Sequence, residues 1–241
     1  MATNALAISA LSMQADVKRI ELIGQNLANI TTPGYRRVFT ATHSFPDIFN
    51  GNVSPERFPY GGIAAEKKID NRVGPIKSTG KILDLAIDGN LGFFELAGAN
   101  GPVYTRRGDF SLDARGRIVS ADGFALMGDS GEIFLPKGKL DIDANGVVKV
   151  DSVKVAKIRI AVIEDANSLT ELGNGLYSGL VSQSNKEVVG VVPGHLEGSS
   201  VVSMTEMVNM LETMRHFEAN QKLMQGYDEV LSKAIQKLGE F

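Results

Sequence analysis

The stretch Leu83-Asp-Leu-Ala-Ile-Asp-Gly-Asn-Leu-Gly-Phe-Phe-Glu-Leu96 holds two short apolar runs on either side of a turn. Short runs with a period of two are typical of strands that bury one face. The Asp88-Gly89-Asn90 tripeptide between them consists of residues that tolerate tight turns. We therefore interpret positions 83–87 and 92–96 as two short strands of an antiparallel β domain.

Three more segments of the middle of the chain have the same character, at 117–120, 132–135 and 155–163. Turn sequences separate them, namely Asp122-Gly123, Asn145-Gly146 and Gly173-Asn174-Gly175. Closely spaced short strands with Asp-Gly and Asn-Gly turns indicate a small antiparallel β domain, which we place at 81–199.

The N-terminal segment has a different period. Leu6, Met13, Ile20 and Leu27 recur every seven residues, and Ala10, Val17 and Gly24 fall between them. Alternating steps of four and three between apolar residues are the seam of a coiled coil. We expect a helix over 3–30 that ends at Thr32-Pro33-Gly34, because proline lacks a backbone donor and glycine favours a turn.

The C-terminal segment repeats this pattern over 201–238. Its first seam position holds Met210, Phe217, Met224, Leu231 and Leu238, and its second holds Met207, Met214 and Ile235. The sequence thus predicts an α+β fold, in which long N- and C-terminal helices form a coiled-coil layer and a small antiparallel β domain is inserted between them. The predicted domains are 1–35 with 200–241 as the helical layer, 36–80 as an extended connector, and 81–199 as the β domain.

Composition excludes several classes of function. The net charge of −3 is too small and too dispersed for nucleic-acid binding. Without cysteine, the chain forms neither disulfides nor thiolate metal sites. No apolar run approaches the ~18 residues of a membrane-spanning helix. The first 19 residues lack a basic start followed by an unbroken apolar block, so we expect no cleaved signal peptide.

A search for catalytic or metal-binding residues gives none. Asp141-Ile-Asp-Ala-Asn-Gly146 begins like a calcium-binding loop, but the position that requires a bidentate glutamate is Ser152. The three histidines, His43, His195 and His216, have no partner at metal-ligand spacing on a shared helix face. We therefore expect no enzyme activity, no cofactor and no small-molecule substrate.

Four blocks of sequence resemble signatures of the rod, hook and hook-associated proteins of the bacterial flagellum. They are Asn26-Leu-Ala-Asn-Ile-Thr-Thr-Pro-Gly-Tyr35, Gly80–Phe94, Tyr104–Asp113 followed by Gly116 and Ala121-Asp122-Gly123, and Leu196–Val201 with Glu206–Met210. The blocks lie in the family's order and together cover nearly the whole chain. Lys81-Ile82 and Asn90-Leu91 depart from the family's usual residues at turns.

The resemblance implies a structural subunit of the flagellar basal-body rod that passes unfolded through the flagellar export apparatus and crosses the periplasm. Its partners would be copies of itself and other rod proteins. The compact segment 131–163 and the short chain favour the proximal-rod member over the distal-rod one, and a distal-rod or hook-type subunit is the alternative. Two other classes stay open: a hydrolase on a β scaffold, and a binding module whose terminal helices form a closed dimer.

The resemblance also implies that the terminal helices stack into the inner layer of a tube, while a lone molecule would leave part of each seam exposed. The residues predicted to form this assembly interface are Leu6, Met13, Val17, Ile20, Leu27, Met207, Met210, Met214, Phe217, Met224 and Leu231. The predicted turn that follows the first helix is Pro33-Gly34.

Overall fold

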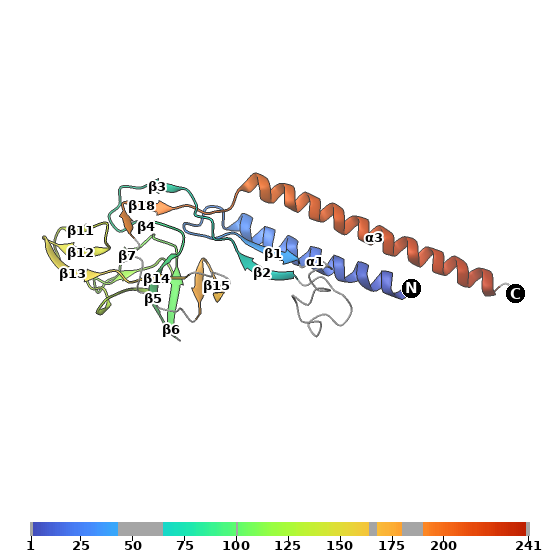
Figure 1. The fold of residues 1–241 in the computed structure, drawn as a ribbon, viewed down its shortest axis with the longest axis horizontal. Coiled ribbons are helices and arrows are strands. Elements are labelled where there is room, and N and C mark those ends of the chain that lie inside the picture. The colour runs from blue at the N-terminus through green and yellow to red at the C-terminus, as the bar shows by residue number, and fades with distance from the viewer. Residues whose placement is uncertain (1, 43–64, 100, 164–167, 180–189, 240–241) are drawn as a thin grey trace. The chain divides into compact units, whose positions relative to one another are not determined.

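The computed structural model describes residues 2–42, 65–99, 101–163, 168–179 and 190–239 (Figure 1). Its helices are α1 (Ala2–Ala28) and α3 (Ser203–Gly239). Its strands are β1 (Val38–Thr42), β2 (Ala65–Ile69), β3 (Ile76–Ser78), β4 (Leu85–Ile87), β5 (Gly92–Gly98), β6 (Gly101–Thr105), β7 (Ser111–Leu112), β8 (Ile118–Val119), β9 (Ala125–Gly128), β10 (Gly131–Glu132), β11 (Leu140–Ile142), β12 (Val147–Val150), β13 (Val153–Lys157), β14 (Ile160–Val162), β15 (Thr170–Gly173), β16 (Leu176–Ser178), β17 (Val191–Pro193) and β18 (His195–Glu197).

The chain divides into two compact units. The described parts of the helical unit are residues 2–27, 38–42, 65–68 and 202–239. The β unit is built from residues 28–37 and from the described parts of 69–201. The predicted connector 36–80 contains β1, β2 and β3, and its residues 43–64 lie outside the described residues.

The β unit is organised around a nine-stranded sheet. Its main path runs β15-β16-β6-β5-β9-β8-β7, with β10 paired to β9 and β14 paired to β5. The strands β11, β12 and β13 form a separate three-stranded sheet (Figure 1). The pairs between these strands are antiparallel.

Strand β5 is buried on both of its faces. Because successive side chains of a strand point to opposite faces, Phe93 and Phe94 enter different hydrophobic clusters. The ring of Phe94 packs edge-on against Phe110 with 5.1 Å between the ring centroids, while Phe93 packs edge-on against Tyr177 at 5.8 Å. The core of the β unit therefore lies on both sides of its central strand.

Two short ribbons complete the β unit, and both join distant parts of the sequence. Strand β4 pairs with β17, and strand β3 pairs with β18. The segments 83–87 and 92–96 contain strands as predicted, but β4 and β5 are not partners. The left-handed Gly89, with φ +99°, lies in the turn that separates them.

The segment 155–163, which the sequence indicates as one strand, is divided between two sheets. Strand β13 pairs with β12, and β14 pairs with β5 of the large sheet. An apolar run shows that a segment is buried, but its periodicity does not show where the chain changes sheets.

The helical unit contains α1 and α3, which run antiparallel, so that the N- and C-terminal ends of the chain lie at the same end of this unit (Figure 1). The side chains that join the two helices are polar. Asn26 Nδ2 lies 3.1 Å from Glu206 Oε2, His216 Nδ1 lies 2.6 Å from Asp16 Oδ2, and Asn220 Nδ2 lies 3.3 Å from Ser12 Oγ.

The predicted fold class, an α+β fold built on a coiled-coil layer, is therefore wrong. The described chain is mostly β-sheet, and its terminal helices do not form an apolar coiled coil. On α1 the buried residues include Asp16 and Asn26, which lie one position before Val17 and Leu27 of the predicted seam. On α3 they are Glu206 and Thr213, one position before Met207 and Met214.

The physical reason for this error is the pairing of polar groups. A heptad pattern locates an apolar stripe but does not identify what covers it. Polar side chains can occupy the contact between two helices when each finds a hydrogen-bond partner there. In this chain the polar residues face the partner helix, and several large apolar residues of α3 face away from it.

Candidate functional site

The turn after α1 is held by bonds within it and by the β unit. Thr32 N donates to the carbonyl oxygen of Asn29 at 3.2 Å, and Gly34 N donates to the carbonyl oxygen of Glu197 at 2.8 Å. Gly34 has φ +63°, a conformation that favours glycine. A β-carbon on Gly34 would lie 2.4 Å from the backbone carbonyl of Arg106, so only glycine fits. The chain turns at Pro33-Gly34, and Gly34 is buried.

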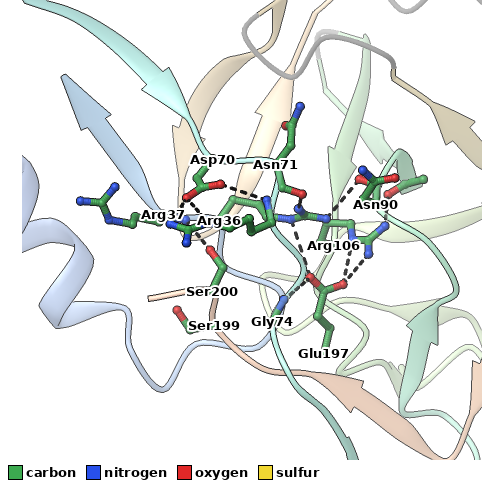
Figure 2. Close-up of polar contacts among 12 residues, drawn as sticks. Arg36, Arg37, Asp70, Asn71, Gly74, Asn90, Arg106, Glu197, Ser199 and Ser200 are labelled. Atoms are coloured by element: carbon green, nitrogen blue, oxygen red, sulfur yellow. Dashed lines mark hydrogen bonds and ion pairs between the residues drawn. The ribbon is translucent and has the colours of Figure 1, made fainter. Parts of the chain in front are cut away.

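Arg106 and Glu197 form a buried ion pair next to this turn (Figure 2). Arg106 Nη2 lies 2.6 Å from Glu197 Oε2, and Arg106 Nε donates to the same oxygen at 2.9 Å. Arg106 Nη1 also donates to the carbonyl oxygen of Gly92 at 2.6 Å, and Nη2 donates to that of Gly89 at 2.7 Å. Since the side chains of both partners are at most 1% exposed, the pair is shielded from water.

Arg36 is the second cation of this cluster. Its Nε lies 3.7 Å from Glu197 Oε1, which also accepts a hydrogen bond from Gly74 N at 3.2 Å. Arg36 Nη1 donates to the carbonyl oxygen of Asn71, and Nη2 donates to that of Asn90 at 3.2 Å (Figure 2). One buried carboxylate thus faces two buried guanidinium groups.

The electrostatics of the cluster follow from this two-to-one ratio. Burial lowers the pKa of both arginines, and the charge of Arg106 lowers the pKa of Arg36 further. Glu197 acts in the opposite direction, because its negative charge stabilises the charged guanidinium groups. The backbone carbonyls around Arg36 and Arg106 solvate the remaining positive charge. We call Arg36, Arg106 and Glu197 the buried cluster.

The buried cluster joins three segments that are far apart in the sequence. Arg36 follows the turn after α1, Arg106 follows β6, and Glu197 ends β18. Ser200 also joins the segment after β18 to the segment after α1. Its Oγ accepts a hydrogen bond from Arg37 N at 2.8 Å, and its backbone N donates to the carbonyl oxygen of Tyr35 at 3.0 Å. The arrangement joins the segment that follows α1 and the segment that precedes α3 to the strands of the β unit.

The sequence search did not select the buried cluster, although a signal for it was present. Arg106 and Glu197 lie within two of the blocks that resemble flagellar signatures, and Arg36 directly follows a third. No single block of sequence shows that Arg36, Arg106 and Glu197 come together in the folded chain. Asn26 was also missed: its side chain bonds both Val38 N at 2.9 Å and the Val38 carbonyl oxygen at 2.7 Å.

The structure places the predicted assembly residues in different environments. Met13, Ile20 and Leu27 of α1 and Met210, Phe217 and Met224 of α3 are partly buried. Val17, Met207 and Met214 are exposed. The side chains of Leu6 and Leu231 lie outside the described residues. The role of this whole set in assembly stays a prediction.

One face of α3 is both apolar and exposed. Met204, Met207, Val208, Leu211 and Met214 follow each other at helical spacing, and their exposed fractions run from 40% at Met214 to 72% at Met204. Glu206 and Thr213, which are buried, lie on the opposite side of the helix. We call these five residues the outer face of α3.

The sequence search considered two kinds of chemical site, the calcium-loop-like segment and the histidines. The Asp141–Gly146 segment covers the end of β11 and the turn to β12, in which Gly146 N donates to the carbonyl oxygen of Asp143 at 3.0 Å. His195 Nδ1 contacts the carbonyl oxygen of Pro193 at 2.9 Å, and His43 lies outside the described residues. Within the described ranges, no group of His, Asp and Glu side chains is arranged to hold a metal ion. Among those same residues, no helix has the length and apolar character needed to span a bilayer.

Comparison with known proteins gives a consistent result. The family described as "Flagellar basal body rod FlgEFG protein C-terminal" matches residues 192–237, and that described as "Flagellar hook protein FlgE/F/G D1 domain" matches residues 86–150. A flagellar basal-body rod protein FlgG of Agrobacterium fabrum is 30% identical over 95% of this chain and 97% of its own length. A flagellar basal-body rod protein FlgF of Caulobacter vibrioides is 28% identical over 98% of both chains. A FlgG of Bacillus subtilis is 27% identical over 90% of this chain and 92% of its own.

These matches define a structural protein of the flagellum. The chain belongs to the flagellar basal-body rod protein family, and its relatives include both FlgF and FlgG. It is a structural rod subunit of the basal body in flagellar motility, as the resemblance implied. The hydrolase alternative is not favoured, because the families that match are structural.

Proposed function

We propose that this chain assembles helically with copies of itself and with other rod proteins through its terminal helices, and that the resulting shaft transmits torque. The observation that carries the proposal is the outer face of α3, which is apolar, exposed and directed away from the polar contacts with α1. A continuous apolar face of this kind marks an interaction surface.

Burial of this face would favour assembly. From Met204 to Met214 the face is ~15 Å long at the α-helical rise of about 1.5 Å per residue. Complete burial of one large apolar side chain stabilises a contact by about 1.5–3 kcal/mol. Two of the predicted assembly residues, Met207 and Met214, lie on this face. The half-buried Met210, Phe217 and Met224 would contribute only what they still expose.

The buried cluster supports the mechanical part of the proposal. A subunit that carries torque requires its β unit to resist shear at both chain ends. Glu197 and its two arginines bind those ends to the sheet by ion pairs and by contacts with backbone carbonyls. The turn at Pro33-Gly34 belongs to the same buried region.

Within the family, we favour a proximal-rod subunit because of the compact segment 131–163, and a distal-rod subunit is the alternative. We further propose that the chain reaches the rod through the flagellar export apparatus, and that it lies in the part of the rod that crosses the periplasm. The support for these finer proposals is the resemblance of the four sequence blocks.

The test replaces Met207 and Leu211 together with aspartate in cells that depend on this chain for swimming. We expect a folded protein that is absent from isolated basal bodies and cells that do not swim, because two charges on the outer face oppose its burial. Gln221→Asp is the matched control, since it adds a charge at an exposed polar position of the same helix. Normal swimming of the double variant would refute the proposal.

A further inference from the structure

A shallow trough lies on the β unit beside the ribbon of β3 and β18. Its volume is about 410 Å³, and its side chains come from the turn after α1, from the ribbon and from the segment after β18. The lining is largely apolar and includes Ile30, Pro33, Pro75, Leu196 and Val201. Pro75, Lys77 and Thr79 alternate along the chain, and Leu196 is the cross-strand partner of Lys77, so one face of the ribbon forms a wall of the trough.

The trough carries a cation that no described residue of its own unit neutralises. Lys77 lines the trough, is exposed, and has no ion pair within the part of the chain that the structure describes. By contrast, three arginines of the same unit form ion pairs at hydrogen-bond distance. The distances are 2.9 Å for Arg107 with Asp109, 2.8 Å for Arg117 with Asp113, and 2.9 Å for Arg159 with Glu95. An apolar trough with a free cation fits an apolar partner that brings a carboxylate.

The outer face of α3 is apolar, and a carboxylate lies beside it, about 100° around the helix from Leu211. It presents methionine, valine and leucine side chains at helical spacing, and the exposed Glu212 directly follows Leu211. A helix that lays such a face into a groove is a recurrent mode of recognition. We propose that the trough receives the outer face of α3 from a second copy of this chain, with Glu212 of that copy close to Lys77.

This inference rests on the proposed function and adds the receiving surface. The trough and the outer face are different surfaces of one chain, so each copy offers one and receives the other. Contacts of this head-to-tail kind produce an open array unless the rotation between copies closes a ring. Charge complementarity between Glu212 and Lys77 would set the register of the helix in the trough.

The absence of cysteine in the natural chain permits a direct test by cross-linking. Thr31→Cys places a thiol on the trough, and Met207→Cys places one on the outer face. Basal bodies isolated from cells that express the full-length double variant are treated with a short bismaleimide. We expect a ladder of dimers, trimers and longer products on a denaturing gel, because each copy is joined to the next.

The matched control is the double variant Asp88→Cys, Met207→Cys, in which the first cysteine is exposed on the β unit but does not line the trough. A ladder in the control as strong as in the trough variant would overturn the proposal. A cross-linked monomer without a ladder would also overturn it, because the helix would then occupy the trough of its own chain.

A charge exchange provides a second readout. Lys77→Glu and Glu212→Lys should each reduce the amount of subunit in basal bodies several-fold, and the combined variant should restore it. If the Met207, Leu211 aspartate variant stays outside basal bodies while the trough gives neither ladder nor rescue, this inference fails and the proposed function stands. If that aspartate variant swims normally, the proposed function itself is refuted.

Discussion

Replacing Glu197 with glutamine tests the buried cluster. The side chain keeps its shape and its acceptor oxygen for Arg106 Nε, but the two buried guanidinium groups lose their counter-charge. Removing one partner of a buried ion pair costs about 3–5 kcal/mol. Because glutamine retains one acceptor, we expect a loss near the lower end of this range for Glu197→Gln and near the upper end for Glu197→Ala.

The assay is urea denaturation of the full chain. The protein has no tryptophan, so tyrosine fluorescence is followed, and the buried Tyr35, Tyr104 and Tyr177 of the β unit report on its packing. In a thermal scan, a loss of ~3 kcal/mol corresponds to a decrease in Tm of about 6–12 °C for a domain of this size class. The unfolding midpoint of the β unit should fall, while the slope of the transition stays the same.

Glu132→Gln is the control, because Glu132 forms an ion pair of 3.0 Å with Arg117 at the surface. It should leave the midpoint unchanged. A further comparison uses the two arginines: Arg36→Met should destabilise less than Arg106→Met, because Arg106 lies 2.6 Å from the Glu197 carboxylate and Arg36 lies 3.7 Å from it. If Glu197→Gln unfolds at the same urea concentration as the natural chain, the cluster does not hold the β unit together.

Three further predictions use local geometry. Gly34→Ala should destabilise more than Gly80→Ala in the same denaturation assay, since both positions have left-handed φ values, +63° and +72°, but only at Gly34 would a β-carbon collide with the backbone. The strain common to both is ~1–3 kcal/mol; equal losses would contradict the steric argument. Asn26→Ala should increase the hydrogen-exchange rate of the Val38 amide, because its acceptor is the Asn26 side chain; unchanged protection would show that this bond is dispensable. Backbone N–H donation lowers the pKa of Asp113 in the folded chain, so Asp113→Asn should destabilise the protein above the ordinary Asp pKa of about 3.9, and this difference should vanish as the pH falls through the lower folded value; a difference that persists in acid would contradict the assignment.

Individual turns between strands could be predicted because their signals are local. The turn at Asn145-Gly146 needs only the residues that form it, and the structure has Gly146 at φ +74°. The pairing of β4 with β17 could not be predicted in this way. Whether β4 pairs with the next strand or with a distant one depends on the packing of the whole sheet, which no local pattern encodes.

The helices show a second limit of pattern reading. The apolar residues of α3 are regular enough to predict a seam, but the sequence does not reveal that Glu206 and Asn26 meet in the contact with α1. Buried polar residues of this kind have no periodic signature, because each depends on one partner far away in the chain. The buried cluster was missed for the same reason, since Arg36 and Glu197 lie at opposite ends of the sequence.

The β unit pairs strands that are far apart in the sequence, and this determines the order in which it can be completed. Ile87 pairs with Val191, and Ile76 pairs with Glu197. If the polypeptide becomes available from its first residue onward, β3 and β4 emerge before their partners β18 and β17. The large sheet, whose strands lie between them in the sequence, can then form first. Contacts between such distant residues close large loops and form slowly. The ribbon of β3 and β18 forms only when β18, the last strand before α3, has emerged. A shortened chain that ends before β18 would therefore leave Arg36 and Arg106 without the carboxylate of Glu197.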